Sequence, residues 1–282
     1  MPVVKRLVIG EVVAEIEPQQ GAGLRSLRVA GRQLLRPGHS WRLVFDSAGD
    51  STADPAGPPH SPLPPVQCPS RAGWEVYEVA RDVAAYSWSD DRGLTLIRWF
   101  RLTMDGVLVQ TTALNTGRAE RLLTVAEQLC LGGSLLADGC RIRPAGTGGR
   151  ELGPAETDKI LVTHPAADRP GGPSPLGAAG EPGVWPQGPD GQDWSELPGA
   201  GSPERDGILR GLPDPWIQVA GGELVASLGW DGTALDRLRY RSDGDGLGLY
   251  PANTSLVVAP AGAPVGPGGA LSWHVQLTAS LV

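Results

Sequence analysis

The sequence predicts an all-β protein, built as one large antiparallel sandwich. Its 282 residues include 40 glycines and 27 prolines, a proportion that interrupts helices often and favours short strands joined by turns. Several runs alternate apolar and polar residues, as half-buried strands do, and no run carries an apolar stripe with the period of a helix. Turns of hairpin length separate many of these runs. We therefore expect a single domain that spans residues 1–282.

The first strands are predicted between residues 3 and 35. The run at 24–29 alternates strictly, and Gly21-Ala-Gly and Ala30-Gly-Arg supply hairpin turns on either side of it. Residues 47–73 follow as a Pro-rich polar loop, in which no regular element can persist.

A dense β region occupies residues 74–114. Its predicted strands are separated by Asp90-Asp-Arg-Gly and by Met104-Asp-Gly, whose Asp-Gly pair tolerates positive φ. We expect a long loop at about 165–215, because this stretch is mainly Pro, Gly, Ala and acidic residues. Strands return after it and end with an alternating run at 271–281.

Composition excludes several classes of partner. A net charge of −7 argues against nucleic acid and anionic membrane surfaces, which bind basic patches. Nowhere do about 18 apolar residues run together, so no transmembrane helix is expected, and the N-terminal apolar run is too short for a signal peptide. The three cysteines form no Cys-x-x-Cys pair, and a cytoplasmic protein with reduced thiols is the simplest interpretation. The sequence does not determine the oligomeric state.

One predicted strand carries a carboxylate and a carboxamide, Glu127 and Gln128, in an otherwise apolar run. A buried polar group without a partner costs about 1–3 kcal/mol, so both groups need partners. Either Glu127 is a structural carboxylate with its partners in the core, or this strand lines a polar ligand site.

Six short segments occur along the chain in a particular order. They are Gly21-Ala-Gly-Leu-Arg-Ser-Leu, Leu102-Thr-Met-Asp-Gly with Leu114-Asn-Thr-Gly, Glu127-Gln-Leu-Cys-Leu-Gly-Gly-Ser-Leu-Leu, Trp185-Pro186, and Val265-Gly-Pro-Gly-Gly-Ala-Leu-Ser-Trp. In this order they resemble the aldose 1-epimerase, or galactose mutarotase-like, superfamily over nearly the whole chain. The resemblance implies an antiparallel β-supersandwich that binds a sugar in a concave cleft.

The resemblance also implies a chemistry, from which this chain departs. In that superfamily a glutamate removes the proton of the anomeric hydroxyl while a histidine protonates the ring oxygen. Gln128 stands at the position of the histidine, and Tyr250, in Tyr250-Pro251, stands at the position of the glutamate. A carboxamide is no useful acid, and a tyrosine with a pKa of about 10 is a poor base. Glu127, His60 and Tyr250 are the candidate catalytic residues, with Tyr250 acting as a donor in the site.

Arg71, Gln128, Trp185 and Trp230 are the candidate substrate-binding residues. Arg71 resembles an arginine that precedes a Trp-rich strand in the family, and its planar fork suits sugar hydroxyls or a carboxylate. An indole offers a rigid platform for the apolar face of a sugar, although each Trp could instead pack in the core.

The four histidines are scattered along the chain. His60, in its Pro-rich loop, could simply be exposed to solvent, and His274 is expected at the surface because it shares a strand face with polar residues. No histidine has a ligand spacing with a carboxylate, and the glycine-rich runs are turns and not nucleotide loops. We expect no metal and no cofactor.

Three hypotheses remain open from the sequence. The leading one is an aldose 1-epimerase-like isomerase acting on a sugar or sugar-like cyclic ligand. The second is a non-catalytic carbohydrate-binding or sensing module, and the third is a scaffold repurposed for rearrangement or cyclisation of a non-sugar biosynthetic intermediate. An acid and a base that face each other across the site would favour the first hypothesis. Polar donors without such a pair would favour the second, and a site lined by apolar side chains would favour the third.

Overall fold

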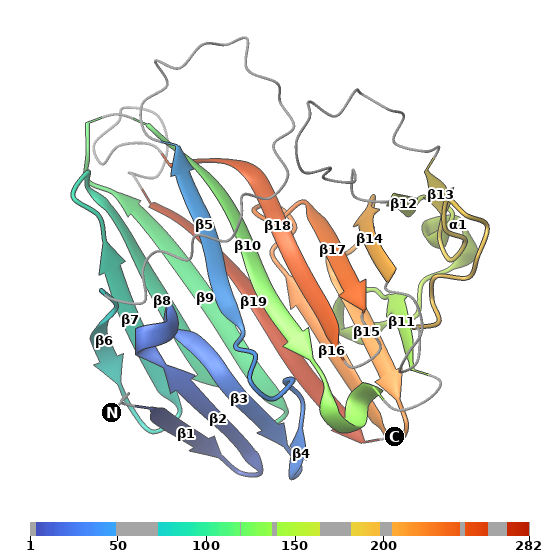
Figure 1. The fold of residues 1–282 in the computed structure, drawn as a ribbon, viewed down its shortest axis with the longest axis horizontal. Helices are drawn as coiled ribbons and strands as arrows, with labels where there is room; N and C mark the ends of the chain where they lie inside the picture. The colour runs from blue at the N-terminus through green and yellow to red at the C-terminus, as the bar shows by residue number, and fades with distance from the viewer. Residues whose placement is uncertain are drawn as a thin grey trace.

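The computed structural model describes residues 4–48, 73–118, 120–136, 140–163, 182–197, 205–242, 246–258 and 270–281. Throughout these residues, every strand pair is antiparallel. The strands form a 4-stranded, a 7-stranded and an 8-stranded sheet (Figure 1). The predicted all-β antiparallel architecture is confirmed.

The 7-stranded sheet has the order β13-β12-β14-β17-β18-β10-β5. In chain order its strands are β5 (Arg42–Ala48), β10 (Arg121–Leu131), β12 (Leu161–Thr163), β13 (Gly183–Val184), β14 (Arg205–Arg210), β17 (Arg237–Ser242) and β18 (Leu247–Val258).

The 8-stranded sheet has the order β11-β15-β16-β19-β9-β8-β7-β6. Its strands are β6 (Glu75–Val79), β7 (Val83–Ser89), β8 (Leu94–Leu102), β9 (Gly106–Asn115), β11 (Arg141–Pro144), β15 (Trp216–Gly221), β16 (Leu224–Trp230) and β19 (Ala270–Leu281).

The 4-stranded sheet is formed by β1 (Lys5–Ile9), β2 (Val12–Glu17), β3 (Gly23–Val29) and β4 (Arg32–Gln33). The helical elements of the described residues are short: the 3₁₀ turns η1 (Pro18–Gln20), η2 (Gly133–Leu136) and η3 (Thr147–Gly149), and the single-turn α1 (Pro154–Thr157). None of the helices in the described ranges is long and apolar enough to cross a membrane.

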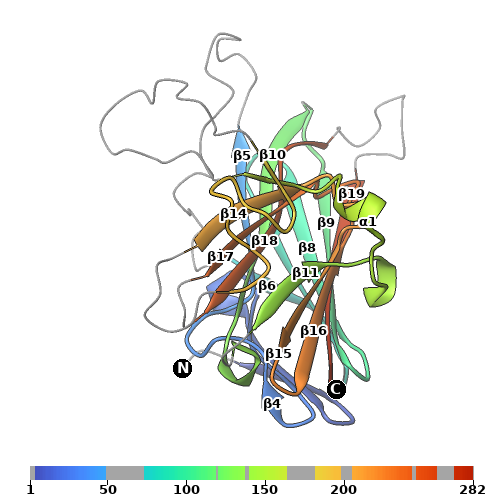
Figure 2. The same ribbon diagram turned by 90° about the vertical axis from the view of Figure 1, so that its right-hand side faces the viewer.

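The two large sheets lie face to face (Figure 2). Buried apolar side chains of both sheets belong to one hydrophobic core cluster. β8 illustrates why: Leu94, Leu96, Arg98 and Phe100 are fully buried, and the residues that alternate with them are more exposed. This period-2 burial is what the alternating sequence predicts. The 4-stranded sheet lies at one end, with β1 against β8 and β3 against β9.

The two hairpin turns predicted in the dense β region are present. Asp90 Oδ1 accepts hydrogen bonds from the backbone N–H of Arg92 (2.9 Å) and of Leu94 (2.8 Å), which closes the β7–β8 turn. The Asp105-Gly106 turn joins β8 to β9, which pair along their whole lengths.

The predicted loop at about 165–215 needs a correction within its described part. β14 lies inside it and pairs with β12 on one side and with β17 on the other. The sequence underestimates this strand because Gly207 is a weak strand former. In the fold Gly207 has a packing role, since a Cβ there would lie 2.6 Å from the Trp194 ring and 2.9 Å from the Tyr240 ring.

Candidate functional site

Neighbouring residues on β10 point to opposite faces of the 7-stranded sheet. Glu127 points into the sandwich, where it is 1% exposed, and Gln128 points to the outer face, which we define as the face turned away from the 8-stranded sheet. The outer face is turned toward the viewer in Figure 1. The two polar residues that stood out in the sequence therefore belong to different environments.

Glu127 is held by two residues of the 8-stranded sheet and by Trp41, which immediately precedes β5. Arg98 on β8 donates from Nη1 to Oε1 (2.9 Å) and from Nη2 to Oε2 (2.8 Å), in a bidentate ion pair across the core. Trp41 Nε1 donates to Oε2 (3.0 Å), and Thr111 Oγ1 donates to Oε1 (3.4 Å). A buried carboxylate is tolerated when it is paired and hydrogen-bonded in this way.

This geometry corrects the prediction of a catalytic Glu127. Of the two alternatives that the sequence left open, the structure selects the structural carboxylate. Both oxygens are occupied, and the side chain lies on the opposite side of the sheet from Gln128 and Tyr250, so Glu127 and Tyr250 do not face one another.

The outer face carries a line of four polar residues across adjacent strands, which we call the polar row: Arg42, Gln128, Tyr250 and Arg239. Gln128 on β10 lies opposite Arg42 on β5, and Tyr250 on β18 lies opposite Arg239 on β17. Gln128 and Tyr250 are cross-strand neighbours, because the β10–β18 register runs unbroken through this position. All four side chains are half-buried.

Hydrogen bonds connect three members of the polar row, and the fourth is bonded to the neighbouring strand β14. Arg42 Nε donates to Gln128 Oε1 (2.9 Å), and the Gln128 carboxamide is hydrogen-bonded to the Tyr250 hydroxyl. At the other end, Arg239 donates from Nε to Asp206 Oδ1 (2.9 Å) and from Nη2 to Asp206 Oδ2 (2.5 Å), a bidentate pair with β14. Gln128 and Tyr250, which the resemblance in the sequence predicts at the positions of the acid and base, are thus brought together.

Gly248 makes room for the Tyr250 phenol. A Cβ at Gly248 would lie 2.5 Å from Tyr250 Oη, so the phenol lies over this glycine. Burial raises the pKa of the Tyr250 hydroxyl, and the hydrogen bond from Gln128 and the charges of Arg241 and Arg239 oppose this only in part. Tyr250 is therefore a neutral donor at physiological pH and not a base.

A second glycine accommodates an arginine near the row. A Cβ at Gly246 would lie 2.6 Å from Arg36 Nη1, which places the Arg36 guanidinium against the sheet two residues before Gly248. Cys130, half-buried, follows Gln128 by two residues and is close enough to Tyr250 to affect its pKa. Nothing in the sequence pointed to Arg36 or Arg42, because contacts between distant segments bring Arg42 beside Gln128 and Arg36 beside Gly246.

The predicted tryptophan platforms are core residues, which corrects a second prediction. Trp185 is 5% exposed, and Trp230 is 4% exposed, with Nε1 donating to the Leu235 carbonyl (3.0 Å). Trp194 is also buried, and it packs edge-on against Tyr240 with ring centroids 6.2 Å apart. Their large apolar rings are satisfied by packing, so none of the three offers a face to a ligand.

His60 and Arg71, the remaining predicted site residues, lie outside the described residues. His274 is exposed on β19, as the sequence predicts. Within the described ranges, no group of three or more His, Cys, Asp or Glu side chains is placed to hold a metal ion.

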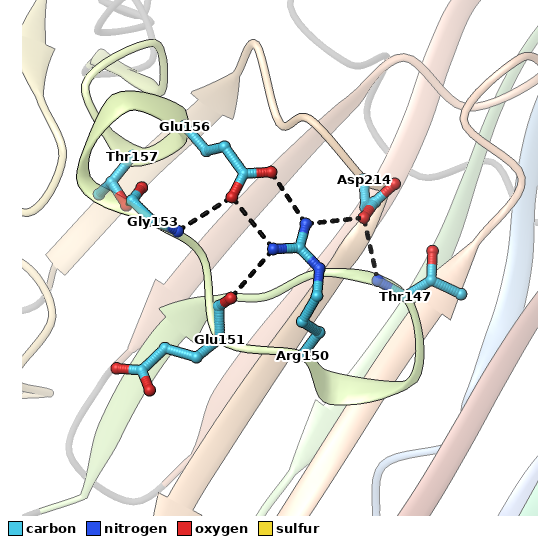
Figure 3. Close-up of polar contacts among 7 residues, drawn as sticks. All are labelled: Thr147, Arg150, Glu151, Gly153, Glu156, Thr157 and Asp214. Atoms are coloured by element: carbon cyan, nitrogen blue, oxygen red, sulfur yellow. Dashed lines mark hydrogen bonds and ion pairs between the residues drawn. The ribbon is translucent and has the colours of Figure 1, made fainter.

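A separate polar network lies next to the 8-stranded sheet, beside η3 and α1 (Figure 3). Arg150 donates to both oxygens of Glu156 (2.8 and 3.1 Å), and its Nη2 lies 3.7 Å from Asp214 Oδ2. Glu156 also accepts from the Gly153 N–H (2.9 Å), and the hydrogen bond from Arg150 is the main reason that its pKa is lowered to about 2. Arg150 thus joins a carboxylate of α1 to one in the segment before β15, and the network ties these two segments together.

Comparisons with known proteins bear on the fold. No family model matches the sequence, and no curated protein matches it. Among solved structures, the Slr1438 protein from Synechocystis sp. PCC 6803 superposes with a TM-score of 0.68 at 13% identity, covering 100% of this chain and 97% of that one. A galactose mutarotase-like protein from Clostridium acetobutylicum gives 0.63 at 11% identity, covering 100% and 99%.

A third similar structure is the GalM/aldose epimerase homologue from C. elegans, with a TM-score of 0.59 at 13% identity and complete coverage of both chains. At these identities the likeness concerns the fold, and it extends over the whole chain. The resemblance stated from the sequence motifs is confirmed at this level: the protein has the fold of the galactose mutarotase-like and aldose 1-epimerase structures.

Proposed function

We propose that this protein is aldose 1-epimerase-like in fold and binds a sugar or sugar-like cyclic ligand at the polar row, without isomerising it by acid–base catalysis. One observation carries the proposal. Gln128 and Tyr250 are hydrogen-bonded to each other on one sheet face, at the positions that align with the family's acid and base. Both are neutral groups, which suit binding better than proton transfer.

The chemical groups of the polar row favour one of the hypotheses that the sequence left open over the other two. Ligand-facing groups of the row are a guanidinium, a carboxamide and a phenol, which recognise oxygen-rich ligands by hydrogen bonds. Acid–base isomerisation is less favoured, because the one carboxylate predicted to act, Glu127, is occupied in the core. A rearrangement scaffold for an apolar intermediate is less favoured too, since it would need an apolar lining.

Two measurements test this proposal. Isothermal titration calorimetry against a panel of pyranoses, sugar acids and sugar phosphates should identify a ligand that binds the wild type. Polarimetry with freshly dissolved α-glucose and α-galactose should show mutarotation at the spontaneous rate in the presence of micromolar protein.

Matched variants localise the binding. Gln128→Leu should weaken binding at least tenfold, whereas Gln110→Leu, on an exposed residue of the opposite sheet, should leave it unchanged. Acceleration of mutarotation that is lost in Gln128→Leu or Tyr250→Phe would contradict the absence of catalysis. Failure of every panel member to bind would contradict the proposal as a whole.

A further inference from the structure

We infer that the group recognised at the polar row is an oxyanion, a carboxylate or phosphate carried by the cyclic ligand, and that Arg42 and Tyr250 hold it. The inference rests on the proposed ligand site and adds the chemical class of the group bound there. It follows from the direction of the hydrogen bonds in the row.

The first step is the orientation of Gln128. A guanidinium has only donors, so the Gln128 atom that receives Arg42 Nε at 2.9 Å must be the carbonyl oxygen. The other end of the carboxamide is then an NH₂ group, which has only donors. Gln128 is locked in one orientation by its arginine partner.

The second step is the state of Tyr250. Gln128 Oε1 already accepts from Arg42, which leaves the NH₂ group of the carboxamide for the Tyr250 hydroxyl, and we therefore assign the NH₂ group as the donor and the Tyr250 oxygen as the acceptor of their hydrogen bond. A phenol that accepts from its neighbour directs its own O–H elsewhere. Tyr250 thus presents a donor, and the position of its oxygen over Gly248 fixes where that donor lies.

The third step concerns Arg42. Its Nε is bound to Gln128, and within the described part of the chain its two terminal nitrogens have no hydrogen-bond partner. The other arginine of the row, Arg239, is already engaged in a bidentate pair with Asp206. Among the described residues, Arg42 is therefore the cation of the row whose terminal donors are not engaged.

Together the chain Arg42→Gln128→Tyr250 ends in donors on both sides. A ligand group that complements it must supply acceptors, and a negative charge is favoured because one of the two donors is a guanidinium. A neutral hydroxyl can also accept a hydrogen bond from these donors. A hydrogen bond between a charged donor and a charged acceptor is about twice as strong as one between neutral groups, so an anion binds more tightly. A carboxylate or phosphate fits this pattern best.

The test compares matched neutral and anionic probes by isothermal titration calorimetry in about 50 mM salt. The probes are glucose, glucuronate and glucose 6-phosphate, so the carboxylate and phosphate arms are separate. We expect at least one anionic probe to bind ten or more times more tightly than glucose. Arg42→Gln and Tyr250→Phe should each reduce that preference, to less than threefold for Arg42→Gln.

The controls separate local from general effects. Arg101→Gln removes the same charge from an exposed position on the 8-stranded sheet, and Tyr77→Phe removes a hydroxyl from a residue that is 57% exposed. Both should keep the wild-type preference. Equal loss in Arg42→Gln and Arg101→Gln would overturn the inference, because net charge alone would then explain it.

The inference and the proposed function can fail separately. If glucose binds as tightly as both anionic probes, and Gln128→Leu weakens that binding, the oxyanion inference is wrong while the ligand site stands. If none of the probes nor any panel sugar binds, both are wrong.

Discussion

Glu127 on β10 and Arg98 on β8 form a bidentate ion pair, with side chains that are 1% and 0% exposed, that joins the two large sheets through the core. The pair links residues 29 positions apart in the sequence. Trp41 and Thr111 complete the shell of the carboxylate. The pair lies on the inner side of β10, while the next residue, Gln128, lies on the outer face at the proposed ligand site.

Glu127→Gln should destabilise the fold and leave ligand recognition intact. Removing one partner leaves Arg98 as an uncompensated buried charge, at a cost of about 3–5 kcal/mol in the free energy of unfolding. Urea denaturation measures this cost. Glu196→Gln is the control, because its pair with Arg141 is exposed (58% and 63%) and contributes at most about 1 kcal/mol.

A double variant distinguishes a lost charge partner from lost volume. Arg98→Met with Glu127→Leu replaces both charges by apolar groups, and should be less destabilised than Glu127→Gln alone. If Glu127→Gln is as stable as the wild type and the folded variant no longer binds the ligand, Glu127 has a role in the ligand site, which contradicts a structural role.

Gly248→Ala should weaken ligand binding with little effect on stability. The new Cβ would lie 2.5 Å from Tyr250 Oη, so the phenol must move off the sheet and lose its place beside Gln128. Titration calorimetry should show a loss comparable to that of Tyr250→Phe. Gly153→Ala is the matched control, since its Cβ would meet nothing closer than 3.7 Å; wild-type affinity in Gly248→Ala would argue against a positioned phenol.

Trp230→Ala should act on stability and not on affinity. Truncating a buried tryptophan costs about 3–5 kcal/mol, and the Leu235 carbonyl also loses its donor. Chemical denaturation should show this loss, while the folded fraction keeps the wild-type Kd. Unchanged stability with lost binding would instead make Trp230 the ligand platform that the sequence suggested.

Buried tyrosines should make the protein sensitive to alkali. Burial raises the pKa of Tyr86 to about 12, so above pH 10 the unfolded chain ionises this residue before the folded chain does. Below pH 10 the residue contributes no pH dependence, and between pH 10 and 12 its contribution falls by up to about 1.4 kcal/mol per pH unit. Tyr86→Phe should flatten the decline in urea midpoint between pH 9 and 11.5. An identical decline in both proteins would contradict the shift.

Much of the fold could be predicted from the sequence, because the patterns that indicate strands and turns involve residues close together in the chain. The alternation of β8 and the turns at Asp90 and at Asp105-Gly106 specify strands and their antiparallel pairing within a few residues. The motifs also aligned Gln128 and Tyr250 with the family's acid and base, and the structure brings these two together.

The rest depends on contacts between distant segments. No pattern in the sequence near Glu127 predicts that Arg98 is its partner. No pattern near Gln128 predicts its contact with Arg42, which is 86 residues away. The tryptophans were ambiguous for a related reason, since an indole in a strand suits a core and a ligand surface equally. Only the sheet packing assigns Trp185 and Trp230 to the core.

The most direct test of the ligand site is NMR mapping of the tightest-binding probe on ¹⁵N-labelled protein. We predict that the side-chain NH₂ resonances of Gln128 and the backbone amides around Gln128 and Tyr250 shift as the probe saturates. The amides around Gln110 and His274, on the outer face of the 8-stranded sheet, should not move. Shifts concentrated on that opposite face, with Gln128 unaffected, would contradict the account.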